Sequence, residues 1–422
     1  MKQCILFLSI TLFLFLDAYG QKKYESLGKY LESKDYFSLK SYLHHSTLPL
    51  ETKDSVYFES IVQNAFGEND AAIKSIHYLS EHYASGLDDN AWIKLLNVLA
   101  DSYVKTFQYN SAAQTYALLL QEYGSKLSPS NQIDYKNNYE LYHALKNIAT
   151  QTIQTVPNDS FSIWRDQVSL WNINVSVDKQ GIQPFIFDSG AGFSTISAST
   201  ANKLNLKIIP SNITVGTATE KKVYSQLAVA DQIEFGSTII KNVVFLVLPD
   251  DQLNFPSIQY QIHGIIGFPV IKELGKLSIS NAGVATILTA DSAIEHANFF
   301  YQGNAIIVKG FSGKSLLNFH FDTGAKQSEL DEDYYKSHKY IVKNSSKKEK
   351  VNLGGAGGIT SFKALQLSKF PLKIGNSPSK ILENINVYPD KESPYGNALG
   401  QDYIQLFDKV IIDFKDCSLE FK

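Results

Sequence analysis

The feature that most constrains this 422-residue chain is a seven-residue segment that occurs twice, 134 residues apart. The first copy is Phe-Ile-Phe-Asp-Ser-Gly-Ala at residues 185–191, and the second is Phe-His-Phe-Asp-Thr-Gly-Ala at residues 319–325. In each copy an apolar run ends at an aspartate, and a glycine two positions later allows another backbone to approach closely. The repeat therefore predicts two related units, each of which holds one carboxylate at the same point of its fold.

The similarity continues beyond the two motifs. Ile-Ile-Gly ends at Gly267 and Ala-Leu-Gly ends at Gly400, 79 and 78 residues after the respective aspartates. From about residue 155 the chain consists of short runs of Val, Ile, Phe and Thr separated by Gly, Asn, Asp and Pro, a texture typical of β-strands. We therefore expect two copies of one β unit, over residues 151–295 and 296–422.

The chain before residue 150 has a different pattern. Long segments carry apolar residues with helical spacing, separated by short polar breaks. Ala71-Ala72 followed by Tyr83 recurs about 40 residues later as Ala112-Ala113 followed by Tyr123, and this spacing resembles that of tetratricopeptide (TPR) repeats. We expect a helical, repeat-like domain over residues 21–150, with a plain helical bundle as the alternative.

The first twenty residues have the pattern of a secretory signal peptide. Lys2 precedes an apolar run from Ile5 to Leu16, and Ala18-Tyr19-Gly20 provides small residues for cleavage before Gln21. The run is too short to span a bilayer comfortably. Cys4 lies ahead of the apolar run, whereas a lipid-acceptor cysteine would follow it, so lipid attachment is the less favoured reading. We expect an exported protein, periplasmic or secreted.

Composition and motifs exclude several classes of function. The formal net charge is -3 and Arg165 is the only arginine, so specific nucleic-acid binding is not expected. After cleavage only Cys417 would remain, and one cysteine cannot form an internal disulfide. No His-Glu-x-x-His motif or P-loop occurs. We therefore expect no metal, no cofactor, no nucleic-acid partner and no membrane span.

The paired aspartates indicate a specific chemistry. Two carboxyl groups held face to face share one proton, so that one acts as a base while the other acts as an acid at the same pH. Such a pair can activate water against a peptide carbonyl. The hydroxyl that follows each aspartate, on Ser189 and Thr323, can anchor its loop by hydrogen bonding.

The motif order Asp-[Ser/Thr]-Gly-Ala, a glycine-bearing hairpin, and then two apolar residues and Gly resembles that of the retropepsin-like aspartic proteases. Here both halves lie in one chain, as in pepsin-type enzymes, and the resemblance covers about residues 160–422. It implies that Asp188 and Asp322 form the catalytic dyad. It further implies two supporting groups: loop residues that lock the dyad together, and flap glycines that close over a peptide. These are Ser189, Gly190, Thr323 and Gly324 for the loops, and Gly216, Gly354 and Gly355 for the flaps.

The resulting prediction is a multidomain α + β chain, in which an N-terminal α-helical, TPR-like domain precedes a bilobal all-β aspartic-protease fold with pseudo-twofold symmetry. Its predicted function is that of an exported aspartic endopeptidase acting on protein or peptide substrates, with a possible protein partner at the helical domain. A non-catalytic protein- or peptide-binding protein, with helical repeats and a degenerate protease cleft, is the alternative. A third reading makes residues 21–150 an inhibitory prosegment, but pepsin-type prosegments are short and basic, unlike this region.

One departure from pepsin-type motifs bears on pH. Ala191 and Ala325 follow the motif glycines, where pepsin-type enzymes often carry a hydroxyl that would lower the pKa values of the dyad. The sequence therefore predicts a bell-shaped activity profile with an optimum at roughly pH 4 to 6.5.

Overall fold

The computed structural model describes residues 24–45, 50–217, 219, 222–289, 297–391 and 393–422. The predicted signal peptide, residues 1–20, lies outside the described residues. The chain divides into two compact units, one up to Ser102 and the other from Tyr103 to Lys422. A helical N-terminal region is followed by a large β-rich part, so that this coarse prediction is confirmed. Among the described helices, none is long and apolar enough to cross a membrane.

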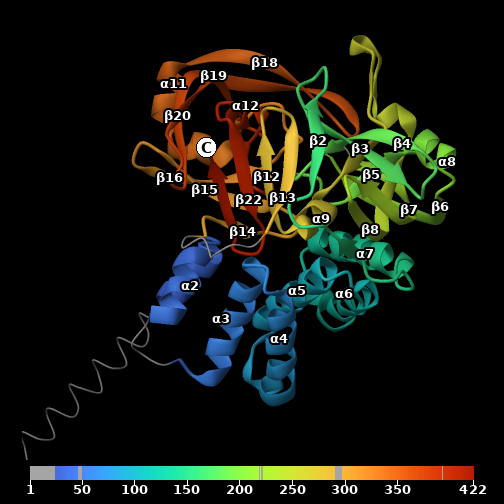
Figure 1. Cartoon of the computed structure of the whole chain (residues 1–422). Helices are drawn as coiled ribbons and strands as arrows, with labels where there is room; N and C mark the ends of the chain where they lie inside the picture. The colour runs from blue at the N-terminus through green and yellow to red at the C-terminus, as the bar shows by residue number, and fades with distance from the viewer. Residues whose placement is uncertain (1–23, 46–49, 218, 220–221, 290–296, 392) are drawn as a thin grey trace, which may run out of the picture. The chain divides into compact units, whose positions relative to one another are not determined.

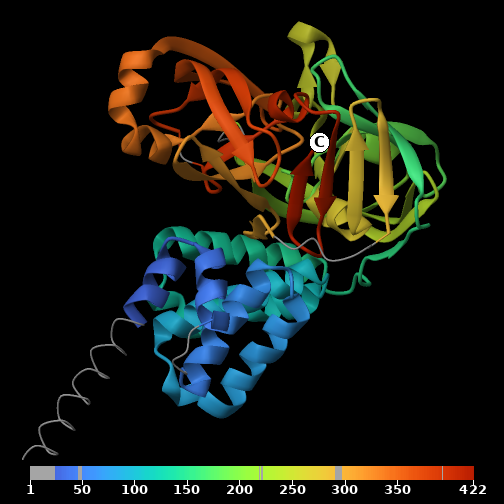
Figure 2. The same cartoon turned by 60° about the vertical axis from the view of Figure 1, so that its left-hand side comes forward.

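The first unit consists of helices packed as antiparallel neighbours, which Figure 2 shows side by side in blue. Residues 24–32 are helical, and they are followed by α2 (Tyr36–His45), α3 (Thr52–Ala65), α4 (Asn69–Tyr83), η1 (Ala84–Gly86) and α5 (Asp89–Lys105), which runs across the unit boundary. Ala72 is fully buried, as its place in the repeated pattern predicts for a helix crossing. The side-chain amide of Asn64 donates to the Ser102 hydroxyl over 2.9 Å, which satisfies a buried polar pair.

The second unit begins with a further helical pair. It comprises α6 (Tyr109–Tyr123), η2 (Gly124–Lys126) and α7 (Pro129–Ala144). Ser128 caps α7 by accepting from the Asn131 N–H over 3.2 Å, and Pro129 occupies the first helical position, where no donor is needed. The amide side chain of Asn137 on α7 pairs with both backbone groups of Thr214, over 2.9 and 2.8 Å. The sequence pattern changes from helical to strand-like near residue 155, whereas the boundary between the two compact units follows Ser102. The two positions differ because α6 and α7 pack on the first half of the β-rich part.

The first β half extends from β1 to β13. Its strands are β1 (Thr152–Gln154), β2 (Ser160–Arg165), β3 (Trp171–Val177), β4 (Ile182–Phe187), β5 (Ser194–Ser197), β6 (Lys207–Gly216), β7 (Lys222–Phe235), β8 (Thr238–Leu248), β9 (Asn254–Phe255), β10 (Tyr260–Gln261), β11 (Gly264–Ile266), β12 (Lys276–Ser280) and β13 (Val284–Leu288). Short helices connect them: α8 (Ala198–Lys203), η3 (Asp250–Gln252), η4 (Pro256–Ile258), α9 (Phe268–Ile271) and η5 (Lys272–Leu274).

The second β half extends from β14 to β23 (Figure 1). Its strands are β14 (Phe299–Tyr301), β15 (Ile306–Ser312), β16 (Ser315–Phe321), β17 (Glu329–Leu330), β18 (Ser346–Gly355), β19 (Gly358–Ile374), β20 (Lys380–Val387), β21 (Asn397–Leu399), β22 (Lys409–Asp413) and β23 (Ser418–Phe421). Its helices are α10 (Glu332–Ser337), α11 (Lys339–Ser345) and α12 (Gln401–Ile404).

Corresponding strand pairings occur in the two halves. Strand β4 lies parallel to β11, with Phe187 opposite Ile266, and β16 lies parallel to β21, with Phe321 opposite Leu399. The last two strands cross between the halves, since β22 pairs with β12 in the sheet that also contains β2, β3 and β4. The segment predicted as the second β unit therefore completes a sheet of the first.

Candidate active site

The two motif aspartates emerge from matching strand ends. Asp188 follows β4 and its N–H donates to the Ile266 carbonyl over 3.0 Å, while Asp322 follows β16 and its N–H donates to the Leu399 carbonyl over 3.0 Å. Each strand carries two phenylalanines near its end, and all four are fully buried, at positions 185 and 187 on β4 and 319 and 321 on β16. Because side chains alternate along a strand, these buried rings fix the direction of the residues between and after them.

Reciprocal hydrogen bonds join the two aspartate loops. The Ser189 N–H donates to the Thr323 hydroxyl over 2.8 Å, and the Thr323 N–H donates to the Ser189 hydroxyl over 3.1 Å. Each hydroxyl then donates across to the other strand, Ser189 to the Phe321 carbonyl over 2.9 Å and Thr323 to the Phe187 carbonyl over 2.7 Å. Both side chains are completely buried, so water does not compete for these bonds.

The motif glycines allow the two loops to come this close. A Cβ atom on Gly190 would lie 2.4 Å from the Asp322 carboxyl carbon, and one on Gly324 would lie 2.3 Å from that of Asp188. The Gly190 N–H donates to Asp188 Oδ1 over 2.8 Å, and the Gly324 N–H donates to Asp322 Oδ1 over 2.8 Å. Each glycine therefore orients its own aspartate and leaves space for the opposite carboxyl.

The two carboxyl groups are coupled electrostatically. Burial raises the pKa of both Asp188 and Asp322 above the ordinary value of 3.8. The charge of Asp322 raises the pKa of Asp188 further, and a hydrogen bond joins the two side chains. Such a pair holds one proton between its members over a range of pH in which isolated carboxyl groups would both be ionised.

The glycines that end the two later motifs pack behind the aspartate loops. A Cβ on Gly267 would lie 2.5 Å from the Phe193 carbonyl carbon, and one on Gly400 would lie 2.7 Å from the Ala325 oxygen. Their N–H groups donate to two buried serine hydroxyls, that of Ser194 over 3.1 Å and that of Ser328 over 3.0 Å. The repeated downstream motif thus serves as a backing layer for each loop.

The hairpin glycines predicted as flaps have different surroundings. The β18–β19 hairpin reaches the first β half, where the Gly357 N–H donates to the Gln252 carbonyl over 3.1 Å. A Cβ on Gly354 would lie 3.2 Å from the Phe255 ring. Gly355 pairs with Gly358 across the end of this hairpin. A Cβ on Gly216 would meet nothing within 4 Å, and Ala218, Glu220 and Lys221 beside it lie outside the described residues.

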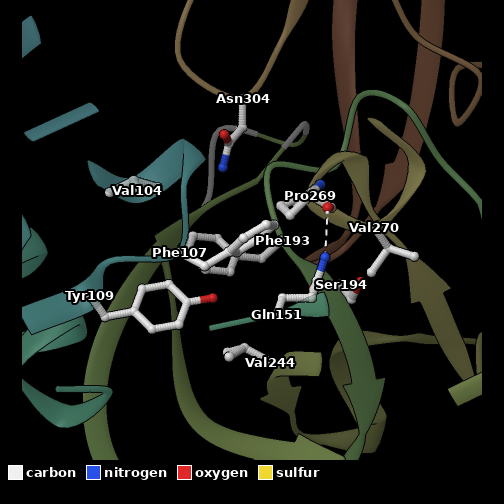
Figure 3. Close-up of a pocket in the computed structure, with 10 residues that line it drawn as sticks. All are labelled: Val104, Phe107, Tyr109, Gln151, Phe193, Ser194, Val244, Pro269, Val270 and Asn304. Atoms are coloured by element: carbon white, nitrogen blue, oxygen red, sulfur yellow. Dashed lines mark hydrogen bonds between the residues drawn. The ribbon is translucent and has the colours of Figure 1, made fainter. Parts of the chain in front are cut away.

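A pocket next to the first aspartate loop is lined by Phe193 and Ser194 but by neither aspartate (Figure 3). It is lined by Val104, Phe107, Tyr109, Gln151, Phe193, Ser194, Val244, Pro269, Val270 and Asn304. The Gln151 amide donates to the Pro269 carbonyl over 3.0 Å at its edge. The volume of this cavity is about 10 Å³, which is enough for one water molecule and not for a peptide.

Two residues near the dyad were not singled out from the sequence. The buried amide of Gln401 donates to the Thr323 carbonyl over 2.7 Å, and its oxygen accepts from Arg165. The second is His320, two positions before Asp322, which interacts electrostatically with Asp188. Both residues are polar where the first copy of the repeat is apolar, since Phe268 matches Gln401 and Ile186 matches His320. The single arginine of the sequence was a further signal for Gln401.

No metal site is apparent in the part of the chain that the structure describes, where no group of three or more His, Cys, Asp or Glu side chains is arranged to hold an ion.

The chain was compared with known proteins. Residues 173–270, which contain Asp188 and the Ile-Ile-Gly motif, match the model of the aspartyl protease family. Among solved structures, the chain is similar to the crystal structure of a retropepsin-like aspartic protease from Rickettsia conorii, with 14% sequence identity and a TM-score of 0.22. That similarity covers 32% of this chain and 92% of the other. No curated protein matches the chain. The family match supports an aspartic protease domain in this protein.

Proposed function

We propose that this chain is an exported aspartic endopeptidase that hydrolyses peptide bonds with water activated between Asp188 and Asp322. The observation that carries the proposal is the reciprocal bonding of Ser189 and Thr323, which holds the two loops so that their aspartates share a hydrogen bond. Ordinary structural carboxylates are exposed or paired with cations, whereas these two are partly buried and lie against each other's loops.

The pair would act as base and acid in one step. The ionised carboxyl removes a proton from the bound water as its oxygen attacks the carbonyl carbon of the substrate. The protonated carboxyl gives its proton to the carbonyl oxygen, which yields a neutral tetrahedral intermediate. As the carbon–nitrogen bond breaks, one carboxyl gives its proton to the leaving nitrogen. The other takes the proton of one hydroxyl of the intermediate as the carbonyl re-forms, which leaves the pair with one proton again.

The remaining parts of the proposal concern the whole chain. We propose that the two β halves are copies related by a pseudo-twofold axis, because both motifs, both backing glycines and the strand pairings correspond. The helical region would bind a protein partner in the manner of TPR repeats, and its substrates would be proteins or peptides. Export rests on the signal-peptide pattern of residues 1–20.

The competing function is a binding protein without catalysis. A chain under no catalytic demand has no need to keep both aspartates, both hydroxyls and both close glycines, and all six are present here. This favours the enzyme over the binding protein.

The test is digestion of a peptide library by the mature chain from Gln21 onward, read by mass spectrometry between about pH 3 and 7. We expect cleavage by the wild-type chain, and none detectable with Asp188→Asn or Asp322→Asn, which are nearly isosteric and should keep the fold. Circular dichroism provides the folding control. Equal cleavage by either variant would show that the two aspartates are not the source of the activity. No cleavage by a folded wild-type chain would support the binding protein instead.

A further inference from the structure

The position two residues before each aspartate differs in chemistry between the two halves. It is Ile186 before Asp188 and His320 before Asp322. Side chains alternate along a strand, and the flanking phenylalanines are fully buried in the core. Ile186 and His320 therefore lie on the opposite strand face, the face from which the aspartates also project.

In the first half this position belongs to an apolar wall. Ile186 packs in a cluster of apolar side chains that also contacts the tip of the other half's hairpin. The cluster consists of Ile186, Val223, Leu248, Leu253, Phe255, Ile262 and Ile265, with Ala356 packed against it. Leu170, Ala191 and Tyr260 also pack against this cluster, so the surroundings of Ile186 are mainly apolar.

In the second half the same position carries a polar group without a partner. His320 is only 8% exposed, and its Nε2 has no hydrogen-bond partner among the described residues. Its ring lies against that of Tyr395, with the centroids 4.7 Å apart. It stands two residues before Asp322, on the strand face that the aspartate shares, and it interacts electrostatically with Asp188.

The imidazole is neutral over most of the pH range in which the enzyme should work. Burial lowers the pKa of His320 to about 4. A neutral imidazole has one donor and one acceptor nitrogen, so Nε2 suits an amide or hydroxyl group. A carboxylate at this place would be repelled by the charge that the dyad carries.

We propose that His320 is a specificity-determining residue, whose Nε2 forms a hydrogen bond with a neutral polar side chain of the peptide next to the bond that is cleaved. This rests on the proposed function. Buried polar atoms in folded proteins are nearly always paired, and a substrate is the natural partner for one that faces a catalytic pair. The enzyme would then prefer an amide or hydroxyl side chain on the His320 side and an apolar side chain on the Ile186 side.

The test uses matched peptides built on a cleavage site of the wild-type enzyme. Asn and Leu, which are similar in shape, are exchanged at the residue on either side of the scissile bond, and kcat/KM is measured for each. We expect the wild-type enzyme to prefer Asn over Leu about tenfold on one side, the size of a single neutral hydrogen bond. His320→Ile, which copies the first half, should abolish or reverse that preference. His320→Gln should keep it.

The control is His263→Ile, which replaces an exposed histidine outside the dyad and should leave the Asn/Leu ratio unchanged. An unchanged ratio in His320→Ile, or a preference for Leu in His320→Gln, overturns the proposal. The same peptides bound to Asp322→Asn, measured by fluorescence anisotropy, report the preference without catalysis. If the wild-type chain cleaves no peptide, the same Asn and Leu exchange is made in a peptide that it binds. Asn-selective binding without cleavage by the wild type would refute the proposed endopeptidase and leave the role of His320 standing.

Discussion

The two aspartate loops contact each other through matching residues, but each loop packs against different residues of the surrounding fold. Ser189 and Thr323 bond to each other's loops in a reciprocal way, and Gly190 and Gly324 each make room for the opposite carboxyl. The residues that pack against the two loops differ between the two halves. The comparison shows which features the chemistry requires in both copies and which each copy can vary.

Helices support the first loop from behind. The Phe193 ring lies 6.4 Å from that of Tyr142 on α7, which in turn stacks on Tyr109 and Tyr116 of α6. The Asn304 side chain donates to the Gly192 carbonyl over 2.9 Å. This packing makes α6 and α7 part of the support of the first aspartate, although the sequence places them in the helical region.

Polar side chains support the second loop. Lys326 and Gln327 are exposed, where Gly192 and Phe193 of the first loop are covered. Its contact from behind is Gln401, which bonds both the Thr323 carbonyl and Arg165 of β2. The only arginine of the chain is thus linked through one glutamine to the second aspartate loop.

Adding a methyl group to either motif glycine should lower the activity more than changes to the residues packed behind the loops. Gly190→Ala and Gly324→Ala each place a Cβ about 2.4 Å from the opposite carboxyl, well below van der Waals contact. We expect both variants to lose at least about 10³-fold in kcat/KM, because misplaced reacting groups are costly. Gly124→Ala, whose Cβ would meet nothing within 4 Å, is the matched control and should retain activity. Full activity in either loop variant would show that the loops are not held this closely.

Much of the contact between the two aspartate loops could be predicted from the sequence, because a repeated motif contains each aspartate, the hydroxyl residue after it and the glycine after that. The supports could not be predicted in the same way. Tyr142 and Phe193 are far apart in the chain and no local pattern links them. The polar character of His320 and Gln401 is visible in the sequence, but only the fold shows that His320 is buried with its Nε2 unpaired and that Gln401 bonds to the Thr323 carbonyl.

Removing each support separately should sharpen the difference between the halves. Gln401→Leu leaves the buried Thr323 carbonyl without its donor, whereas Tyr142→Ala removes a ring contact from Phe193. We expect activity to fall about 10- to 100-fold for Gln401→Leu, and a loss of about 3 kcal/mol or more in unfolding free energy for Tyr142→Ala. Urea denaturation and peptide hydrolysis together separate the two effects. Equal effects on activity and stability from both variants would mean that the supports do not differ in kind.

A smaller effect should appear in the pH dependence of stability. The folded pKa of Asp188 is raised, so its protonated form contributes stability that is present below pH 3.8 and is lost as the pH rises towards the folded pKa. Asp188→Asn removes this loss, and should raise Tm at pH 7 by roughly 2–4 °C or more. Near pH 3 the variant and the wild type should melt alike. Thermal melts at both pH values check this, and a variant less stable at pH 7 would contradict the raised pKa of Asp188.

The central claim is that Asp188 and Asp322 act as one unit. The most direct measurement is kcat/KM on one defined peptide for the wild type, Asp188→Asn, Asp322→Asn and the double variant, at the pH optimum. Groups that act as a unit are strongly non-additive, so each single change should lower kcat/KM by several orders of magnitude and the double change should add little. Additive losses, with the double variant much worse than either single variant, would show that the two carboxyl groups work independently and would contradict the account.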